Sequence, residues 1–329
     1  AALHLALKAK GFGPEDKLIA PTYTFVATVE VGEYLGMQCE LIDSDKEGFN
    51  IDLNLIEDKL KSDQSIRTII PVHFAGEALD MKSLSSLANK YGVFILEDAA
   101  HAFEARTNIG KVGDTDYAAA FSFYANKNIT TGGEGGALST NDDKLADKVR
   151  KLSLHGISKD GWNRFKLGSS WRYDVTDLGF KYNMTDLSAS IGNWQLKHYE
   201  SWYLKRQEII KKYLTGLKKI EGVQCPKVNF ERHACHLFII RIDENKWSIS
   251  RDQLIQEINK KGIGTSVHYI PVHMHSYYQK KYSFNFYDYP NAFKLSKEVI
   301  SLPLYPKLSE LEVDYTINSI CEIWEKFKA

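Results

Sequence analysis

One lysine stands where an amine could react with a carbonyl compound. The segment Phe121–Leu138 reads FSFYANKNITTGGEGGAL, so Lys127 follows Ser122 by five residues and precedes a glycine-rich turn. A lysine in a loop is usually a solvated surface charge, and that remains the alternative interpretation. An amine partly removed from water can form a Schiff base with an aldehyde, and glycines allow close backbone approach and positive φ.

An acidic residue ends an apolar stretch earlier in the chain. In Val93–Ala105, VFILEDAAHAFEA, the apolar run leads into Glu97 and Asp98, and His101 follows after two alanines. One interpretation is a strand-end acid that caps the next helix. The other is that Asp98 faces a cationic ring nitrogen, because a carboxylate there keeps a pyridinium protonated and lets the ring withdraw electrons.

A third segment with polar side chains precedes a long amphipathic stretch. It is Leu178–Asp186, LGFKYNMTD. Thr185 is predicted to be the N-cap of the helix that follows, with Asp186 in the first turn. Asn183 is then free for another task, such as donating a hydrogen bond to a phosphate.

These segments must be held by a scaffold, and the first half of the chain alternates short apolar runs with amphipathic stretches. Such alternation favours an α/β domain with a largely parallel, buried sheet, in which ligands bind beyond the carboxyl ends of the strands. The predicted strands are Lys17–Pro21, Gln38–Asp43, Arg67–His73, Val93–Asp98, Tyr117–Tyr124 and Gly136–Thr140. The predicted helices are Phe25–Leu35, Leu53–Lys61, Met81–Tyr91 and Asp143–Leu154.

The second half of the chain is predicted to start with a long helix and to continue as a smaller α+β domain. The helical pattern runs from Thr185 to about Lys219 and can link two domains. We expect a large domain over residues 1–215 and a small one over residues 216–329. The expected elements of the small domain are strands His236–Ile242 and Thr265–Tyr269 and helices Ser250–Lys261 and Glu310–Phe327.

The composition gives no indication of a nucleic-acid-binding or membrane protein. Lys+Arg and Asp+Glu both number 42 among 329 residues, so bulk charge gives no reason to expect a nucleic-acid or membrane partner. No run of about eighteen apolar residues predicts a transmembrane helix, and no signal peptide is recognisable. The four cysteines lack framework spacing and are interpreted as reduced thiols of a cytoplasmic protein: Cys39, Cys225, Cys235 and Cys321.

Taken together and in this order, the motifs resemble the DegT/DnrJ/EryC1/StrS family of sugar aminotransferases, over essentially the whole chain. The matching segments are PTYTFVAT (Pro21–Thr28), PVHFAG (Pro71–Gly76), EDAAHA (Glu97–Ala102), FSFYANKNITTGGEGG (Phe121–Gly136) and GFKYNMTD (Gly179–Asp186). The resemblance implies the type I fold of pyridoxal-phosphate (PLP) enzymes, with a mostly parallel sheet in the large domain and a smaller α+β C-terminal domain.

The resemblance assigns roles to individual residues. Lys127 matches the lysine that forms the Schiff base and moves the proton, which makes it the predicted catalytic residue. Asp98 matches the carboxylate that pairs with the ring nitrogen of the cofactor. His101 matches the position beside the phenolic oxygen, which the family fills with Gln or His, and Ser122 matches a ligand of the phosphate.

Further roles come from the same resemblance. Phe25 matches an aromatic residue packed on the face of the cofactor ring. Asn183 matches an asparagine that reaches the phosphate from the neighbouring subunit, which implies a homodimer with shared active sites. His268 matches a position near the sugar substrate.

The start of the chain departs from the family pattern. Ala1–Lys10 reads as a helix already under way, without an N-cap residue before it, so we expect a segment upstream. The family's phosphate-binding Gly-Thr or Ala-Thr would immediately precede the Ala-Ala-Leu-His that opens the sequence. Of this phosphate cradle at the helix N-terminus, only the backbone around Ala1 is part of the sequence.

The resemblance also implies the activity, namely transfer of an amino group from an amino acid, with glutamate expected, to a nucleotide-linked keto sugar. Two C-terminal runs, HACHLFIIRID (His233–Asp243) and KGIGTSVHY (Lys261–Tyr269), look most like UDP-4-amino-4-deoxy-arabinose aminotransferases, which act on UDP-linked 4-keto sugars.

Four alternatives stay open at this point. A metal site could use His233, Cys235 and His236, or His268, His273 and His275, although neither spacing is a standard zinc pattern. A dinucleotide-binding dehydrogenase would need GxGxxG in the first strand–helix turn, and the sequence has none there. A PLP-dependent sugar dehydratase would carry histidine in place of Lys127. The last alternative is a non-catalytic or regulatory protein on the same fold, which the joint presence of Lys127, Asp98 and Ser122 disfavours.

Overall fold

The computed structural model describes residues 1–158 and 172–329. The helices of the larger part are α1 (Ala2–Lys10), α2 (Ala27–Glu33), α3 (Leu53–Ser62), α4 (Met81–Tyr91) and α5 (Asp143–Leu152). The remaining described helices are α7 (Asp186–Leu217), α8 (Arg251–Lys260), α9 (Ser276–Tyr282), α10 (Pro290–Glu298) and α11 (Glu310–Phe327). The strands are β1 (Lys17–Pro21), β2 (Gln38–Ile42), β3 (Ile66–Ile69), β4 (Phe94–Asp98), β5 (Ala118–Ser122), β6 (Gly136–Ser139), β7 (Val223–Gln224), β8 (Phe238–Ile242) and β9 (Val299–Leu302).

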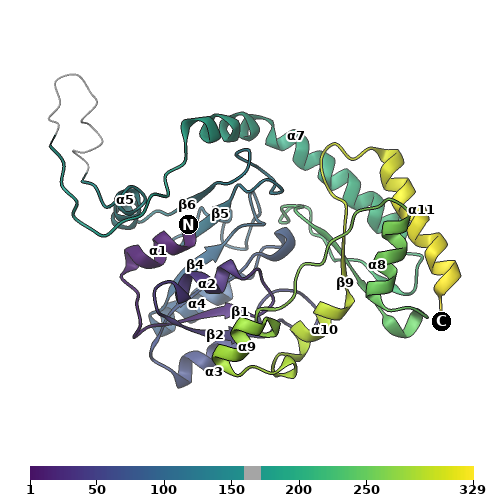
Figure 1. Ribbon diagram of the computed structural model, residues 1–329, viewed down its shortest axis with the longest axis horizontal. Coiled ribbons are helices and arrows are strands. Elements are labelled where there is room, and N and C mark those ends of the chain that lie inside the picture. Colours follow the sequence, from purple (N-terminus) through teal and green to yellow (C-terminus); the bar gives the residue numbers. More distant parts are fainter. Residues whose placement is uncertain (159–171) are drawn as a thin grey trace.

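The larger sheet has the order β2-β1-β3-β4-β5-β6, in which only β6 is antiparallel to its neighbour. Its two faces are covered separately (Figure 1). Leu18 and Leu96 point to the face packed by α1, α2 and α5, whereas Ile19 and Ile95 point to the face packed by α3 and α4. Both faces are buried, so the strands read as continuous apolar runs. The predicted α/β class with a mostly parallel sheet is confirmed.

Side chains at the helix starts explain where several helices begin. Asp52, Asp80 and Asp142 each accept a hydrogen bond from a backbone N–H of the first turn of α3, α4 and α5. These bonds satisfy donors that have no partner within the helix. Thr185 does the same for α7 by accepting from the Ser188 N–H, so the predicted N-cap is confirmed.

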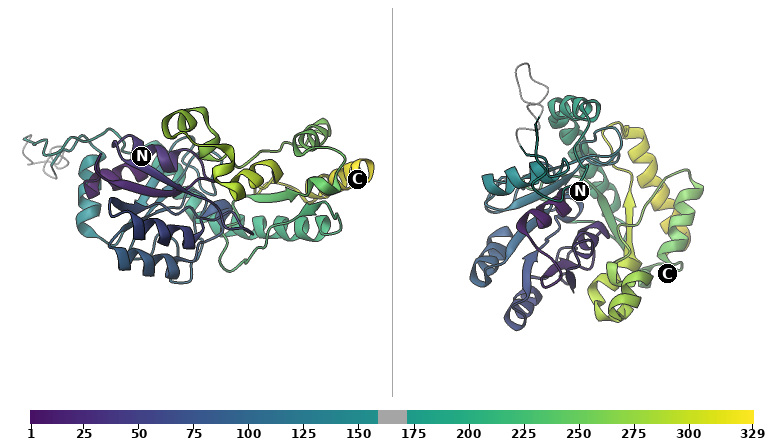
Figure 2. Two further views of the ribbon diagram at one scale, coloured as in Figure 1. Left: turned by 90° about the horizontal axis from the view of Figure 1, so that it is seen from below. Right: turned by 60° about the vertical axis from the view of Figure 1, so that its left-hand side comes forward.

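The long helix α7 carries the chain from the larger sheet to the C-terminal part (Figure 1). Its second half packs with α8, α11 and the sheet β7-β8-β9 through a core that includes Ile210, Tyr213 and Leu217. The chain then returns, because Val272 and Tyr278 belong to the core of the larger part. Figure 2 shows α9 and α10, in yellow-green, beside the larger sheet. Residues of the C-terminal half therefore reach the edge of that sheet.

Most predicted elements agree with the structure, and the bounds of β1, α4 and α11 match the predictions residue for residue. The strand predicted over Thr265–Tyr269 is wrong, because only Ser266 makes a bridge, to Ser301. Instead of alternating between two faces, the residues after Ser266 bend towards the larger sheet, where Tyr269 contacts His101. The buried strand β9 was not predicted, since a four-residue apolar run can be helix or strand. The domain boundary near residue 215 stays a prediction.

Within residues 1–158 and 172–329, no helix combines the length and the apolar character needed to cross a membrane.

Candidate active site

Two of the predicted site residues lie at one edge of the larger sheet because their strands are parallel neighbours. Asp98 is the last residue of β4, and Ser122 is the last residue of β5. In the parallel register Asp98 lies opposite Ala120, so Ser122 extends two residues beyond it. This is the edge at which open α/β sheets bind ligands.

The Asp98 carboxylate is buried, with 6% of the residue exposed, and it is held by neutral donors. Its Oδ2 accepts from the Thr28 hydroxyl at 2.7 Å, and its Oδ1 accepts from the Ala100 N–H at 3.1 Å. The Thr28 hydroxyl accepts in turn from Thr24 at 2.9 Å. The stretch between β4 and β5 is described in full and contains no helix, so the alternative of a helix cap is wrong.

This environment fits a cationic ring nitrogen of a cofactor. A buried carboxylate is stable only with hydrogen bonds and a compensating charge, and Asp98 makes no ion pair among the described residues. Lys127 is a cationic group that interacts electrostatically with Asp98 without forming an ion pair with it. A protonated pyridine nitrogen would supply the missing cation.

Lys127 is half-buried in the loop after β5. Burial lowers the pKa of its amine to about 8, and the charge of Asp98 opposes this shift. The backbone N–H of Lys127 donates to Tyr124 O at 3.0 Å, which fixes the start of the side chain. Its amine has no hydrogen bond or ion pair with any residue in the described parts of the chain. A substantial share of the amine is therefore neutral at mildly alkaline pH and free to attack a carbonyl carbon.

The glycine-rich turn after Lys127 is closely packed. A Cβ on Gly136 would lie 2.7 Å from Phe121 O, and a Cβ on Gly135 would overlap the Thr131 side chain. Gly132 has φ of +88°, as expected for a turn that needs glycine. The backbone N–H of Thr130 also donates to the Gln195 side chain of α7 at 2.9 Å. The turn is thus anchored to α7.

His101 is buried at the same edge, with 6% of the residue exposed. Its Nδ1 accepts from the Ala75 N–H at 3.2 Å, and its Nε2 lies 3.0 Å from the Tyr269 hydroxyl. Burial, and then the charges of Lys127 and His268, hold the pKa of the imidazole well below its usual range. His101 is consequently neutral.

His268 and Phe25 both pack against Tyr269, with ring centroids 4.9 Å and 5.8 Å from its ring. His268 pairs with the Ser301 hydroxyl through Nδ1 at 2.7 Å. Burial, and then the charge of Lys127, lower the pKa of His268 to about 4, so it is neutral and close to the amine. Phe25 precedes α2, is 57% exposed and lies with its ring centroid 5.8 Å from that of Tyr269. An exposed aromatic face of this kind can pack on a planar ligand.

The three predicted phosphate ligands, Ser122, Ala1 and Asn183, lie on three different elements of the fold. The hydroxyl of Ser122 accepts from the Tyr124 N–H at 3.3 Å. Ala1 is the N-cap of α1, so the backbone N–H groups that open this helix lie beside it. Asn183 lies exposed before α7 and donates to Met184 O at 3.4 Å. No described interaction joins Asn183 to Asp98 or Lys127 within this chain.

Several residues of the site were not assigned from the sequence. Thr28 lies in the motif PTYTFVAT and Tyr269 in KGIGTSVHY, but their partners Asp98 and His101 are 70 and 168 positions away. His236 was considered only as a metal ligand. In the structure its Nδ1 bonds to Asn128 Oδ1 at 2.8 Å, next to Lys127, and its ring lies 4.5 Å from that of His101.

The metal alternative has no suitable cluster in the described residues, where no three His, Cys, Asp or Glu side chains converge. The histidines have other partners. His233 accepts from the Cys235 N–H at 2.9 Å, and His273 bonds to Thr22 and to Phe286 O.

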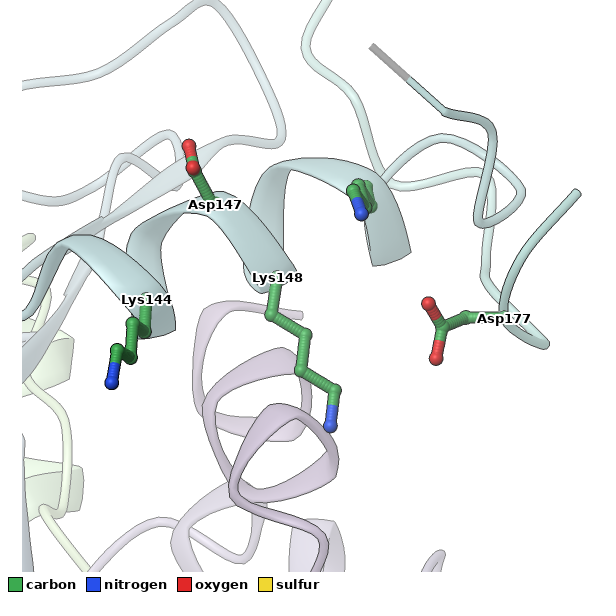
Figure 3. Close-up of a pocket in the computed structure, with 5 residues that line it drawn as sticks. Lys144, Asp147, Lys148 and Asp177 are labelled. Atoms are coloured by element: carbon green, nitrogen blue, oxygen red, sulfur yellow. The ribbon is translucent and has the colours of Figure 1, made fainter. Parts of the chain in front are cut away.

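A surface depression of about 470 Å³ lies on α5, away from the strand ends. Its lining combines both signs of charge, namely Lys144, Asp147, Lys148, Lys151 and Asp177. In Figure 3, Lys144 and Lys148 extend from α5 on the same side, and Asp177 approaches from the chain beyond it. None of the predicted site residues takes part, so we do not place the chemistry here.

Comparison with known proteins identifies the family of the chain. Residues 1–321 match the model of the DegT/DnrJ/EryC1/StrS aminotransferase family. The chain is 44% identical to the spore coat polysaccharide biosynthesis protein SpsC of Bacillus subtilis over 330 residues, which is 98% of this chain and 83% of SpsC.

Solved structures resemble the whole chain. A protein assigned as the sugar aminotransferase Spr1654 of Streptococcus pneumoniae superimposes in its PMP form with a TM-score of 0.91 at 32% identity, over 99% of this chain and 86% of that one. Its PLP form gives a TM-score of 0.89 at 31% identity, over 99% and 85%. The family match, the identity to these relatives and the site at the strand ends lead to one conclusion: the chain belongs to the DegT/DnrJ/EryC1/StrS aminotransferase family and is a sugar aminotransferase that depends on pyridoxal phosphate.

Proposed function

We propose that this enzyme transfers an amino group from an amino acid, with glutamate as first candidate, to a nucleotide-linked keto sugar, with a UDP-linked 4-keto sugar as first candidate. The observation that carries the proposal is the half-buried amine of Lys127, which has no partner in the described parts of the chain, beside the buried carboxylate of Asp98. The nucleotide and the donor rest on the resemblance of the C-terminal motifs.

The residues around these two groups could hold the cofactor, which supplies a ring that withdraws electrons from the carbon exchanging its amino group. Asp98 would accept the N–H of the ring nitrogen, and Phe25 would pack on the ring face. Ser122 and the backbone at Ala1 would hold the phosphate, because hydroxyl and N–H donors at the start of a helix suit an anion. His101 would stand beside the phenolic oxygen.

Lys127 is proposed to act twice. Its neutral amine would hold the cofactor, and the same amine, when free, would move a proton at the reacting carbon of the substrate. Neutral His268, near Lys127, is proposed to hydrogen-bond the sugar. Because its Nδ1 is engaged by Ser301, its Nε2 is the atom left for the substrate.

A panel of keto sugars tests the proposal. We expect amino-sugar product from the parent enzyme with glutamate and a UDP-linked 4-keto sugar, measured by mass spectrometry, and none from Lys127→Ala. A dTDP-linked panel runs in parallel. Product from free keto sugars but from no nucleotide-linked one would contradict the proposed substrate class.

Uptake of the cofactor should depend on pH. The protonated amine has no lone pair for attack, so the rate at which cofactor-free enzyme bonds PLP should rise with pH, with a midpoint near the pKa of about 8. Absorbance at the visible band of bound cofactor, followed at a fixed PLP concentration, measures this rate. A midpoint near 10.5, the ordinary lysine value, would contradict the burial-lowered pKa of the attacking amine.

We also propose that the active unit is a homodimer in which Asn183 of the partner subunit completes the phosphate site. Support comes from large apolar side chains that are exposed on α7 and on the loop before it, including Leu178, Leu187, Trp194 and Leu204. A surface of this kind is typical of an interface. The four cysteines are free, which fits the proposed cytoplasmic location.

Mixed dimers test whether the site is shared. An Asn183→Ala chain keeps Lys127, and a Lys127→Ala chain keeps Asn183, so a heterodimer of the two has one site with both residues. We expect each variant alone to be impaired at limiting PLP and the purified heterodimer to regain activity in one of its two sites. Heterodimers without any regained activity would argue against shared sites.

A further inference from the structure

The active-site edge holds a tyrosine that no comparison or motif assigns to a role. Tyr269 is half-buried, and its ring lies nearly parallel to that of His101, with centroids 6.0 Å apart and an interplanar angle of 23°. The ring centroid of Phe25 lies 5.8 Å from that of Tyr269, at an interplanar angle of 47°. Tyr269 thus contacts both the aromatic residue proposed for the ring face and the histidine proposed for the phenolic oxygen.

The hydrogen bonds determine which atoms of this pair carry protons. The Ala75 N–H donates to His101 Nδ1, so Nδ1 uses its lone pair and carries no proton. In the neutral ring the proton is then on Nε2. Nε2–H therefore donates to the Tyr269 oxygen, 3.0 Å away. The hydroxyl hydrogen of Tyr269 remains unused, since the hydroxyl has no other partner among the described residues.

The unused hydrogen is available at the site of the chemistry. The negative charge of Asp98 contributes, after burial, to raising the pKa of the Tyr269 phenol, so the hydroxyl stays protonated and lies within electrostatic reach of Asp98. Lys127 interacts with the same carboxylate and also with His101. A donor at the end of the chain from Ala75 through His101 to Tyr269 is thus oriented before any ligand binds.

We propose that the Tyr269 hydroxyl donates directly to the phenolic oxygen of the bound cofactor, and that His101 is a positioning residue behind it. This rests on the proposed placement of the cofactor between Asp98 and Phe25. In this series of hydrogen bonds, the Ala75 N–H donates to His101 and His101 donates to the Tyr269 oxygen. The Tyr269 hydroxyl would therefore donate to the phenolic oxygen while its own oxygen accepts from His101. Such a chain polarises and strengthens its last hydrogen bond.

The visible spectrum of the loaded enzyme tests this assignment without an activity assay. A hydrogen-bond donor at the phenolic oxygen stabilises the negative charge on that oxygen. It thereby lowers the pKa of the neighbouring proton whose loss changes the visible band. In Tyr269→Phe the pH midpoint of the visible-band transition should therefore rise, by about one pH unit, as expected for loss of one hydrogen bond to a charged oxygen. The matched control is Tyr203→Phe, whose hydroxyl bonds to Phe230 O and His233 O. Its midpoint should equal that of the parent.

A second variant decides which residue touches the oxygen. If Tyr269 is the direct donor, His101→Ala raises the midpoint by less than Tyr269→Phe does. An unchanged pH midpoint in Tyr269→Phe overturns the inference. A rise of a full pH unit in His101→Ala also overturns it, and this second test holds even if Tyr269→Phe does not retain the cofactor. Borohydride reduction of the parent separates this result from failure of the proposed function. A label on a lysine other than Lys127 would contradict the cofactor placement itself, whereas a label on Lys127 with the reversed order of midpoints contradicts only the role of Tyr269.

Discussion

Replacing Lys127 by alanine is expected to abolish turnover while leaving the fold and noncovalent cofactor binding in place. A positioned base alone contributes up to about 10⁴-fold, and this variant also removes the covalent bond to the cofactor, so we expect a loss of at least about that size. The fold should survive because the amine makes no described hydrogen bond, and its burial already disfavours the charged form. Asp98, Ser122 and Phe25 remain to hold the cofactor.

Reduction with borohydride followed by peptide mapping measures the loss directly. The parent should carry a pyridoxyl group on Lys127, and the variant should carry none. Lys148→Ala is the matched control, because it removes an exposed lysine from α5 and should keep both label and turnover. A pyridoxyl group on any other lysine of the parent would overturn the assignment of Lys127.

The fold was predictable where local rules determine it. Strand–helix alternation indicated the parallel sheet, and apolar runs located the strands β4 and β5 in the sequence. Asp98 was predicted at the end of its strand, whereas Ser122 was predicted within a strand over Tyr117–Tyr124; the structure ends β5 at Ser122 and pairs it with β4, so the two residues reach the same edge. Thr185 was predicted as a cap because threonine before an acidic first turn is a local signal.

The rest of the site depends on contacts between distant parts of the chain, for which spacing carries no signal. His236 bonds to Asn128 across 108 positions, and Tyr269 reaches His101 only because the chain folds back from the C-terminal half. The same return explains why the strand predicted over Thr265–Tyr269 was wrong. Only Ser266 pairs with a strand residue, Ser301, and three residues later Tyr269 contacts His101 of the larger sheet instead.

Replacing Asp98 by asparagine should remove its charge at almost unchanged geometry. The amide oxygen can still accept from the Ala100 N–H, and the amide nitrogen can donate to Thr28, whose hydroxyl can then donate to Thr24. The side chain would thus stay in place, without the negative charge that stabilises a protonated ring nitrogen. We expect a rate loss of roughly 10²-fold or more, the size found when one preorganised electrostatic group is removed.

The comparison must be made between cofactor-loaded enzymes, so that weaker binding is not mistaken for slower chemistry. Asp142→Asn provides the control, because it changes net charge by the same amount and asparagine caps α5 as well as aspartate does. Its rate should equal that of the parent. If loaded Asp98→Asn turns over at a near-normal rate, Asp98 does not act on the ring nitrogen. The carboxylate held by Thr28 and Ala100 would then serve only to fix the end of β4.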